Sequence, residues 1–417
     1  MLTSWFNSPG GSAKPEDQHA SPGTDDDDTE VMEASEGNVL SHLISQLRPG
    51  ADLSRVTLPT FILEPRSMLE RITKGVKKPL NPILGEIYTC HWDFEDGTRA
   101  YYISEQTSHH PPKSSYFYMA PEHHIRIDGT LKPRSKFLGN SAASLMEGVA
   151  FLTLLNRGKN PAKGERYLLT QPNMYARGIL FGKMKYELGD HSIVKCPELD
   201  LSCDVEFKTK GWVSGTYNAI GGVIKRESTG EVLYELSGFW SGEMSITCLK
   251  TGKTTVFFNA NKSKPSAPIT RPIEEQEERE SQRLWQTTAH AVVIKNHTVA
   301  TDEKSKIEDR QREEAAKRVQ DGVEWHPRLF RAVHDEPGSL EEGEDSLEWI
   351  INADIDTSAN AAKQTEQVLA IYPILKGQKP AASATPPSAT NIQPTAGASN
   401  ATSPDLLRSA SSDLIDI

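Results

Sequence analysis

The sequence predicts a mainly β domain built around one large antiparallel sheet or barrel, with helices on its C-terminal side. From Leu84 to about Phe258 the chain is strand-like, with frequent turn signals such as Glu95-Asp-Gly97 and Ser228-Thr-Gly230. Few helical patterns separate these strands, which favours short antiparallel connections over crossover helices. After Ile273 the pattern changes to charged helical segments.

The composition is that of a cytoplasmic globular protein with polar appendages. Hydrophobic residues make up 36% of the 417 residues and charged residues 25%, which suits a packed core. The start of the chain lacks the basic and apolar segments of a signal peptide. The apolar run at 149–155 is too short to span a bilayer. Four cysteines without metal-ligand spacing are interpreted as reduced thiols: Cys90, Cys196, Cys203 and Cys248.

Charge is unevenly distributed along the chain. The formal net charge is −11, but residues 1–39 hold nine acidic residues and one lysine (−8), and residues 335–417 hold 13 acidic and four basic residues (−9). Subtracting both from −11 leaves +6 for residues 40–334. A basic folded part suits membranes with anionic phospholipids. It lacks the arginine and lysine stripes of nucleic-acid-binding proteins, so we expect no nucleic-acid partner.

The chain begins with an acidic tail that is predicted to be disordered. Residues 1–37 are rich in Gly, Pro, Ser and Asp. A helix is predicted over 38–48, where Asn38 can cap the first turn and Pro49 stops the last. Its apolar residues recur at i, i+3, i+4 and i+7 and form one stripe, namely Leu40, Leu43, Ile44 and Leu47. The stripe fits either a helix docked on the core or a mobile amphipathic flap.

Two charged helices are expected after the strands. The first is predicted over 274–285 and the second over 301–320, where Gly322 ends it. The segment at 325–330 then closes the ordered region. From about Lys376 to the end, Ala, Ser, Thr and Pro dominate, which predicts a second disordered tail.

The stretch Glu105–Pro112, EQTSHHPP, is the most unusual part of the strand region, and Lys113 follows it. A metal site is one interpretation, since His91, His123 and His124 could join the histidine pair. However, the sequence shows no diagnostic spacing of carboxylates and histidines. Nucleophilic catalysis is disfavoured because no GxSxG elbow is present. Phosphate binding fits better, because histidine and lysine donate hydrogen bonds to phosphate oxygens.

Two further segments carry groups suited to phosphate. Lys77 and Lys78 lie in KKPLNP, a second proline-stiffened segment. On the predicted second helix, Lys304, Glu308 and Arg312 are spaced i, i+4 and i+8. They drift by only about 80° and therefore share one face. The alternative is an ordinary surface ion pair between Glu308 and Arg312, worth a few tenths of a kcal/mol.

Together these segments resemble the oxysterol-binding-protein-related family of lipid carriers. EQTSHHPP matches the family signature EQxSHHPP at every fixed position, and KKPLNPILGE (77–86) matches a second conserved block. The triad on the second helix, followed by Trp325-x-Pro-Arg-x-Phe330, is similar to the family's C-terminal signature. The resemblance covers about residues 38–330.

The resemblance implies a lipid-binding domain over 38–375. This domain would hold a lid at 38–50, a nearly complete antiparallel β-barrel around a lipid tunnel at about 84–260, and a C-terminal helical region at 273–375. In the family, matching residues bind the headgroup of phosphatidylinositol 4-phosphate at the tunnel mouth. Carried over, they are Lys78, Asn81, His109, His110, Lys304, Glu308 and Arg312. Together with the stripe at 38–48, the candidates for lining the tunnel are Leu58, Phe61, Ile62 and Leu63.

The resemblance also implies a lipid transfer protein, not an enzyme, with a bound lipid and no catalytic residue, cofactor or metal. Residues 54–71 and the signature look most similar to the fungal branch that carries phosphatidylserine. The chain would exchange phosphatidylserine for phosphatidylinositol 4-phosphate. It would act as a monomer, peripheral at endoplasmic reticulum–plasma membrane contacts. A sterol carrier and a lipid-sensing scaffold that does not transport are the open alternatives.

One segment departs from the family pattern. Relatives carry a helical stretch between the block at Glu70 and KKPLNP, whereas only residues 71–77 intervene here. We therefore expect those helices to be missing, which bears on how the tunnel closes.

Overall fold

The structure is a computed structural model that describes residues 29–30, 60, 63–70, 78–160, 163–178, 184–210, 215–333 and 347–379. All of them belong to one compact unit, 1–381. The predicted lid at 38–50, the tunnel candidates Leu58, Phe61 and Ile62, and the short segment 71–77 lie outside the described residues. A part of each predicted tail is described. In the N-terminal tail, Thr29–Glu30 forms β1, which pairs with β12 (Met184–Cys196), and in the C-terminal tail residues 376–379 are described.

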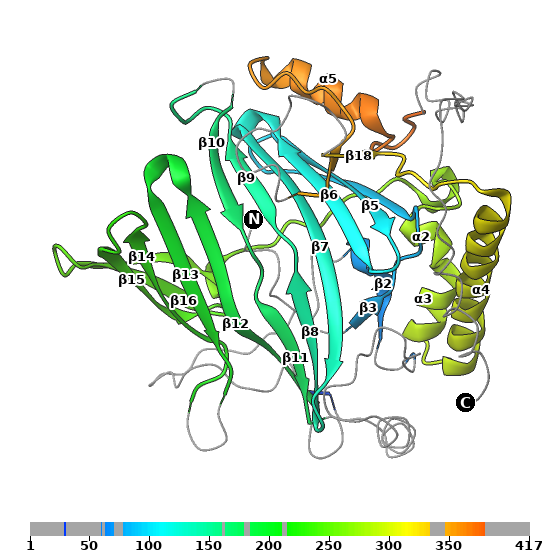
Figure 1. The fold of residues 1–417 in the computed structure, drawn as a ribbon, viewed down its shortest axis with the longest axis horizontal. Coiled ribbons are helices and arrows are strands. Elements are labelled where there is room, and N and C mark those ends of the chain that lie inside the picture. The colour runs from blue at the N-terminus through cyan, green and yellow to red at the C-terminus, as the bar shows by residue number, and fades with distance from the viewer. Residues whose placement is uncertain are drawn as a thin grey trace, which may run out of the picture. The chain divides into compact units, whose positions relative to one another are not determined.

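One large antiparallel sheet dominates this unit (Figure 1), and its strands pair along the path β17-β16-β15-β14-β13-β12-β10-β9-β7-β6-β5-β4. The strands on this path are β4 (Ile87–Asp93), β5 (Arg99–Ser108), β6 (Lys113–Ala120), β7 (Ile125–Phe137), β9 (Ala150–Leu154), β10 (Glu165–Leu169), β12 (Met184–Cys196), β13 (Leu201–Lys208), β14 (Ala219–Arg226), β15 (Val232–Phe239), β16 (Glu243–Cys248) and β17 (Thr254–Asn259). Strands close in sequence pair with one another, as short turns require. The predicted mainly β fold with a large antiparallel sheet is confirmed.

The sheet forks between its two longest strands, β7 and β12. One half of β7 pairs with β9 and the other with β8 (Ser141–Glu147), while β12 pairs with β10 and with β11 (Asn173–Arg177). Hence β8 and β9 together pair with the length of β7, and β10 and β11 together pair with the length of β12. Each of these two pairs of strands is separated by a short interruption. Gly148 lies at the first interruption with φ +118°, and a Cβ there would be 2.1 Å from the Thr130 carbonyl oxygen. Pro172 lies at the second, where it offers no backbone donor.

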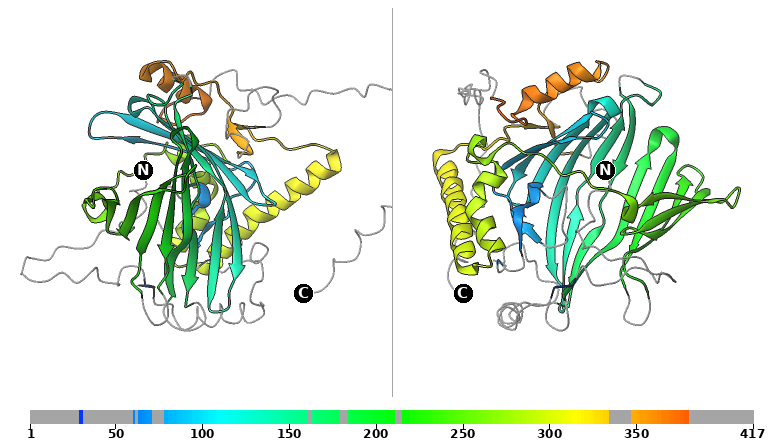
Figure 2. Two further views of the ribbon diagram at one scale, coloured as in Figure 1. Left: turned by 60° about the vertical axis from the view of Figure 1, so that its left-hand side comes forward. Right: turned by 180° about the vertical axis from the view of Figure 1, so that it is seen from behind.

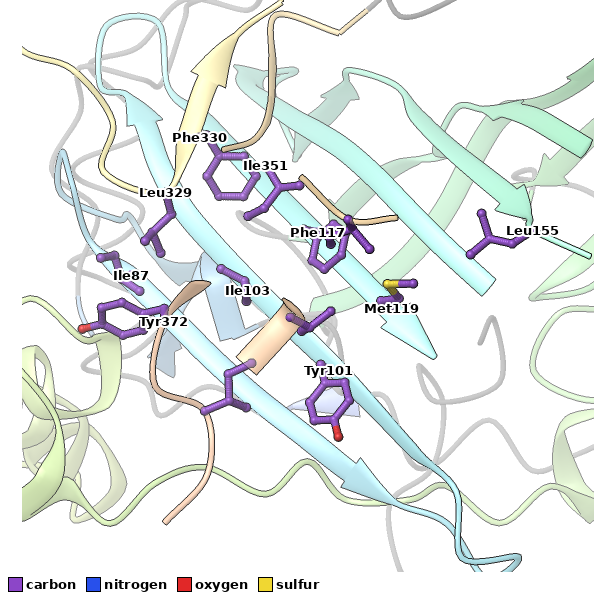
Figure 3. Close-up of a cluster of buried hydrophobic side chains, with 13 residues drawn as sticks. Ile87, Tyr101, Ile103, Phe117, Met119, Leu155, Leu329, Phe330, Ile351 and Tyr372 are labelled. Carbon is purple, nitrogen blue, oxygen red and sulfur yellow. The ribbon is translucent and has the colours of Figure 1, made fainter. Parts of the chain in front are cut away.

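Alternating side chains give β4, β5 and β6 two apolar faces. The first face packs against C-terminal segments: β18 (Phe330–Ala332), β19 (Trp349–Ile351) and α5 (Ala361–Ile371). Figure 3 shows this contact, in which sheet residues Ile87, Tyr101, Ile103, Phe117 and Met119 meet Leu329, Phe330, Ile351 and Tyr372. The opposite face carries Tyr88, Cys90, Trp92, Ala100, Tyr102, Tyr118 and Ala120. Both faces are thus apolar, but only the first is covered by the C-terminal segments.

Helices stand beside the β4 edge of the sheet. Here α2 (Ser281–Leu284), α3 (Gln286–Val293) and α4 (His297–Asp321) lie next to the parallel pair β2 (Leu63–Ser67) and β3 (Lys78–Leu80), as Figures 1 and 2 show. The predicted second helix is α4, which starts a turn earlier than expected because Asn296 caps it, and Gly322 ends it with φ +64°. None of the helices in the described ranges is long and apolar enough to cross a membrane.

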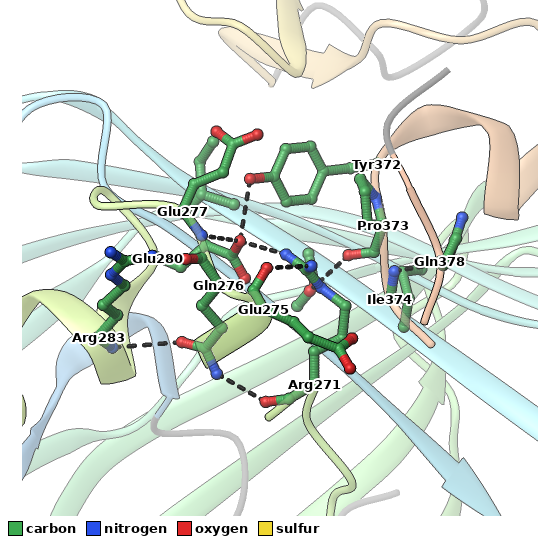
Figure 4. A network of polar contacts seen from close by, with 12 residues as sticks. Arg271, Glu275, Gln276, Glu277, Glu280, Arg283, Tyr372, Pro373, Ile374 and Gln378 are labelled. Carbon is green, nitrogen blue, oxygen red and sulfur yellow. Dashed lines mark hydrogen bonds and ion pairs between the residues drawn. The ribbon is translucent and has the colours of Figure 1, made fainter. Parts of the chain in front are cut away.

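The predicted helix over 274–285 is wrong at its start. A 3₁₀ turn covers Ile273–Glu275, and α2 begins only at Ser281. The intervening residues make contacts that do not fit a helix, as Figure 4 shows. The Glu280 carboxylate accepts hydrogen bonds from the Arg271 guanidinium, the Glu277 backbone N–H and the Tyr372 hydroxyl. Contacts with residues far along the chain therefore override local helix propensity here.

Candidate headgroup-binding site

The signature EQTSHHPP ends strand β5 and forms the turn into β6. Gln106 is fully buried and holds the base of this turn, because its amide nitrogen donates to the Ser108 carbonyl at 2.8 Å and its amide oxygen accepts from the Ser114 hydroxyl at 2.5 Å. Ser108 pairs with Lys113 across the turn. The two histidines and two prolines are therefore presented at a strand end whose base is fixed by a buried amide.

Glu105 connects the signature to the C-terminal block. Its two carboxylate oxygens accept the backbone N–H groups of Arg328 and Leu329, each at 2.8 Å. The side chain is 1% exposed, and burial raises the pKa of Glu105 to about 7 even though these donors favour the ionised form. The first residue of the signature thus has a structural role.

The second block, KKPLNPILGE, lies directly against the signature. The Gly85 N–H donates to the Gln106 carbonyl at 3.0 Å, and the Gln106 N–H donates to the Glu86 carbonyl at 2.9 Å. Trp325 from the C-terminal block contacts Gly85, with its ring 3.5 Å from where a Cβ would be. Three segments far apart in sequence therefore meet around Gly85.

Glu86 fixes this block to the helices. Its carboxylate accepts the Ile83 N–H at 3.0 Å, the Ser281 hydroxyl at 2.6 Å and the Trp285 indole N–H at 2.9 Å. Burial raises the pKa of the Glu86 carboxyl despite these three donors. The segment that bears Asn81 is consequently held at one end by a fully buried network.

Helix α4 brings the third set of predicted residues. Lys304 is 7% exposed and its ammonium group lies 2.5 Å from a Glu308 oxygen. Arg312 pairs instead with Asp309, and its side chain is 65% exposed. Glu308 and Arg312 therefore pair with other residues of this helix, not with each other as the spacing alone suggests.

His109 lies between the second block and α4. Burial and the adjacent His110 lower the pKa of His109, while the Pro82 backbone and the Glu308 carboxylate act in the opposite direction. The two rings are 4.5 Å apart, centre to centre. The His109 Nδ1 atom is buried and has no hydrogen-bond partner among the described residues. One residue of the signature thus faces both other segments and keeps a free ring nitrogen.

Comparison with known proteins identifies the family. The family model described as oxysterol-binding protein matches residues 72–358. The chain is 50% identical to the oxysterol-binding protein-like protein OBPa of Candida albicans over 380 residues, which cover 82% of this chain and 86% of the relative. The chain belongs to the oxysterol-binding protein family. It is also 46% identical to oxysterol-binding protein homolog 6 of Saccharomyces cerevisiae, with 85% of this chain and 86% of the relative aligned.

Solved structures of the family share the fold. The Osh1 ORD domain in complex with ergosterol matches with a TM-score of 0.60 and 19% identity, covering 78% of this chain and 88% of that one. The Osh3 ORD in complex with PI(4)P from Saccharomyces cerevisiae matches with a TM-score of 0.52 and 19% identity, covering 79% and 93%. The chain therefore shares the fold of these ORD domains.

The predicted family site is brought together in part. His109 and the pair Lys304–Glu308 lie near one another, whereas Asn81, His110 and Arg312 are exposed to solvent. The backbone of Lys78 belongs to β3, and its side chain lies outside the described part. The remaining predicted residue, Leu63, is 4% exposed and packs with Leu80, Ile83 and Trp285. Lys113 is held with Lys132 by Glu348.

Sequence reasoning missed the residues that assemble this family site. Gln311 on α4 accepts the Leu84 N–H at 3.3 Å, and Gln106 and Glu86 hold the two blocks together. The spacing could have indicated Gln311. At i+7 it lies only about 20° around the helix axis from Lys304, whereas Arg312 at i+8 lies about 80° away. No local signal exists for Gln106 or Glu86, because both act across strands.

Two other features lie apart from these blocks. A cavity of about 400 Å³ opens at the ends of β12, β13 and β14, lined by Asp190, His191, Glu206, Phe207, Lys208, Thr209, Gly215, Thr216 and Ala219. None of these is a predicted site residue. In the described part of the chain, no three His, Cys, Asp or Glu side chains group to hold a metal ion. The histidine cluster considered from sequence alone therefore does not form there.

Proposed function

We propose that this protein is a non-enzymatic lipid transfer protein that exchanges phosphatidylserine for phosphatidylinositol 4-phosphate between membranes. The observation that carries the proposal is the meeting of the signature turn, the KKPLNP block and α4 around His109. The Osh3 ORD, which shares the fold, is solved with PI(4)P. The relatives aligned over most of this chain include several fungal proteins.

The headgroup would be bound by cationic and imidazole groups at this meeting point. The free Nδ1 of His109 can accept or donate a hydrogen bond according to its protonation, so it suits a phosphate that is present in either of two charge states. Lys304 adds an ammonium group that Glu308 orients at 2.5 Å. Asn81, His110 and Arg312 are exposed and so able to move onto a ligand, and Lys78 completes the proposed set.

The acyl chains would pack in the interior of the fold, along the buried apolar sheet face opposite the one that the C-terminal segments cover. This face carries Tyr88, Trp92, Tyr102 and Tyr118, and each CH₂ that it buries contributes about 0.8 kcal/mol. We place the protein in the cytoplasm as a monomer that docks on anionic membranes, such as endoplasmic reticulum–plasma membrane contacts. The charge of +6 over 40–334 supports such docking.

A transfer assay tests exchange directly. Purified protein should move labelled phosphatidylserine from donor to acceptor vesicles faster when the acceptor contains phosphatidylinositol 4-phosphate. Equal rates with and without the phosphoinositide would contradict exchange, and binding without transfer would favour a lipid-sensing scaffold.

The histidine pair offers a matched mutational test. His109→Ala with His110→Ala should abolish extraction of phosphatidylinositol 4-phosphate from vesicles. The control is His123→Ala with His124→Asn, which removes another adjacent pair, and Asn tolerates the positive φ of 56° at position 124. Extraction by the first variant at the level of the control would exclude the pair from the site.

A sterol is the second candidate for the exchanged lipid, because the Osh1 ORD is solved with ergosterol and with cholesterol. Competition separates the two lipids. Excess ergosterol should leave phosphatidylserine extraction unchanged if phosphatidylserine is the cargo, and should displace it if one cavity carries both.

A further inference from the structure

The Leu84 peptide is held from both sides by residues far along the chain. Its N–H donates to the Gln311 side-chain oxygen at 3.3 Å, and its carbonyl accepts from Arg279 at 2.9 Å. Leu84 precedes Gly85, whose N–H is bonded to Gln106 of the signature. This peptide is thus the point at which the KKPLNP block is joined both to α4 and to the segment before α2.

Arg279 also reaches α4 itself. Its second terminal nitrogen pairs with Glu314, which follows Gln311 by three residues and so lies on the same side of the helix. Gln311 is 7% exposed, whereas the Arg279 and Glu314 side chains are 32% and 34% exposed. We use the name Leu84 bridge for the contacts of Gln311 and Arg279 with the Leu84 backbone together with the Arg279–Glu314 ion pair.

The Leu84 bridge is one of the contacts that hold α4 beside the block next to the histidine turn. Gln311 is one turn beyond Glu308, and Leu84 is two residues beyond Pro82. Glu308 and Pro82 are the two neighbours from these segments that influence His109. A shift of α4 along the block would therefore change the distance between the Lys304–Glu308 pair and the His109 ring directly.

We propose that Gln311 and Arg279 are positioning residues for the headgroup site, which act through the Leu84 peptide and do not touch the lipid. The inference rests on the proposed function, because it assigns them to recognition of the phosphorylated headgroup. Neither residue belongs to the set predicted from the sequence. The second lipid carries no 4-phosphate, so its binding does not depend on the spacing between α4 and His109.

The test uses the full chain and Gln311→Met, which removes the acceptor without changing charge or much volume. We expect extraction of phosphatidylinositol 4-phosphate from phosphatidylcholine vesicles to weaken about fivefold to tenfold, the effect of losing about one hydrogen bond. Extraction of phosphatidylserine from matched vesicles should change less than about twofold. Faster hydrogen exchange of the Leu84 amide would verify that the bridge is broken.

Lys306→Gln is the matched control, because Lys306 is an exposed cation on α4 that pairs with Glu303, which lies outside the Leu84 bridge. This variant should leave the extraction of both lipids unchanged. Arg279→Lys keeps the charge but replaces the two nitrogens that bond Leu84 and Glu314 with a single ammonium group, and should weaken extraction of the phosphoinositide alone. It also replaces Gln311→Met if that variant does not fold.

Three outcomes would overturn the inference. These are an equal loss of extraction for both lipids, unchanged phosphoinositide extraction despite faster exchange of the Leu84 amide, and a loss in Lys306→Gln as large as in Gln311→Met. Wild-type protein that extracts phosphatidylserine but no phosphatidylinositol 4-phosphate would instead refute the proposed function, and the inference with it.

Discussion

At the scale of single residues, His109 shows how burial prepares a side chain for an anionic ligand. Burial and the neighbouring His110 lower the pKa of His109, so the imidazole is neutral at pH 7 in the free protein. Its Nδ1 has no hydrogen-bond partner in the part of the chain that the structure describes, which is costly for a buried polar atom. A bound phosphate would supply both a partner and a negative charge.

This state predicts a pH dependence of headgroup binding. A phosphate beside His109 raises the pKa of the imidazole, so the complex takes up a proton that the free protein lacks. Affinity for phosphatidylinositol 4-phosphate should therefore increase as pH falls from 8 to 6.5, by at most about tenfold per pH unit for one proton. Vesicle binding measured across this range checks the slope. His109→Asn should flatten it, and an equally steep slope in that variant would assign the proton to another group.

At the scale of elements, the fork between β7 and β12 depends on backbone geometry. The interruption between β8 and β9 occurs where Gly148 adopts φ +118° and approaches the Thr130 carbonyl. Any side chain at this position would meet both a strained backbone and a close oxygen. The fork lets two long strands hold different partners along their length, which a regular ladder would not allow.

Substitution at this position should be costly. Gly148→Ala should lower the free energy of unfolding by about 2–4 kcal/mol, because strain and a backbone contact add. Gly139→Ala is the matched control: Gly139 also has a positive φ, +84°, but a Cβ there meets nothing within 4 Å. It should cost only about 1 kcal/mol. Urea midpoints compare the two, and equal midpoints would show that the Thr130 contact is relieved cheaply.

At the scale of the whole molecule, buried carboxyl groups join the blocks that make the site. Burial raises the pKa of Glu70 and of Glu105 to about 7, and it also raises the pKa of Glu86. Two of them belong to the signature blocks, where backbone N–H groups and side chains hold them. Because buried acids join these distant segments, the stability of the fold depends on pH.

The sign of that dependence follows from proton binding. Between pH 4.5 and about 7 the folded protein holds protons on Glu70 and Glu105 that the unfolded chain has released. Stability from these groups is therefore fullest below pH 4.5 and is lost as pH rises through about 7. Thermal melts should show Glu105→Gln losing less stability than the wild type between pH 5 and 8. Parallel curves would contradict the raised pKa.

Much of the fold and of the candidate site follows from local pattern. Turn signals and alternation predict the large antiparallel sheet between Leu84 and Phe258, and Gly322 marks the end of α4. These features depend on contacts between near neighbours in sequence, which periodicity records. The three blocks that meet at the site are instead recognised by their resemblance to the family's signatures.

The tertiary structure decides which hydrogen-bond and ion-pair partners particular side chains have. It paired Arg312 with Asp309, turned Gln311 toward Leu84, and kept Gln276–Glu280 out of a helix. Each of these depends on a group that lies on another segment or on the angle of a helix face. Spacing within one segment allows more than one partner, as for Arg312, and does not identify the other segment that a side chain meets, because burial and hydrogen-bond partners are set by what packs against the side chain.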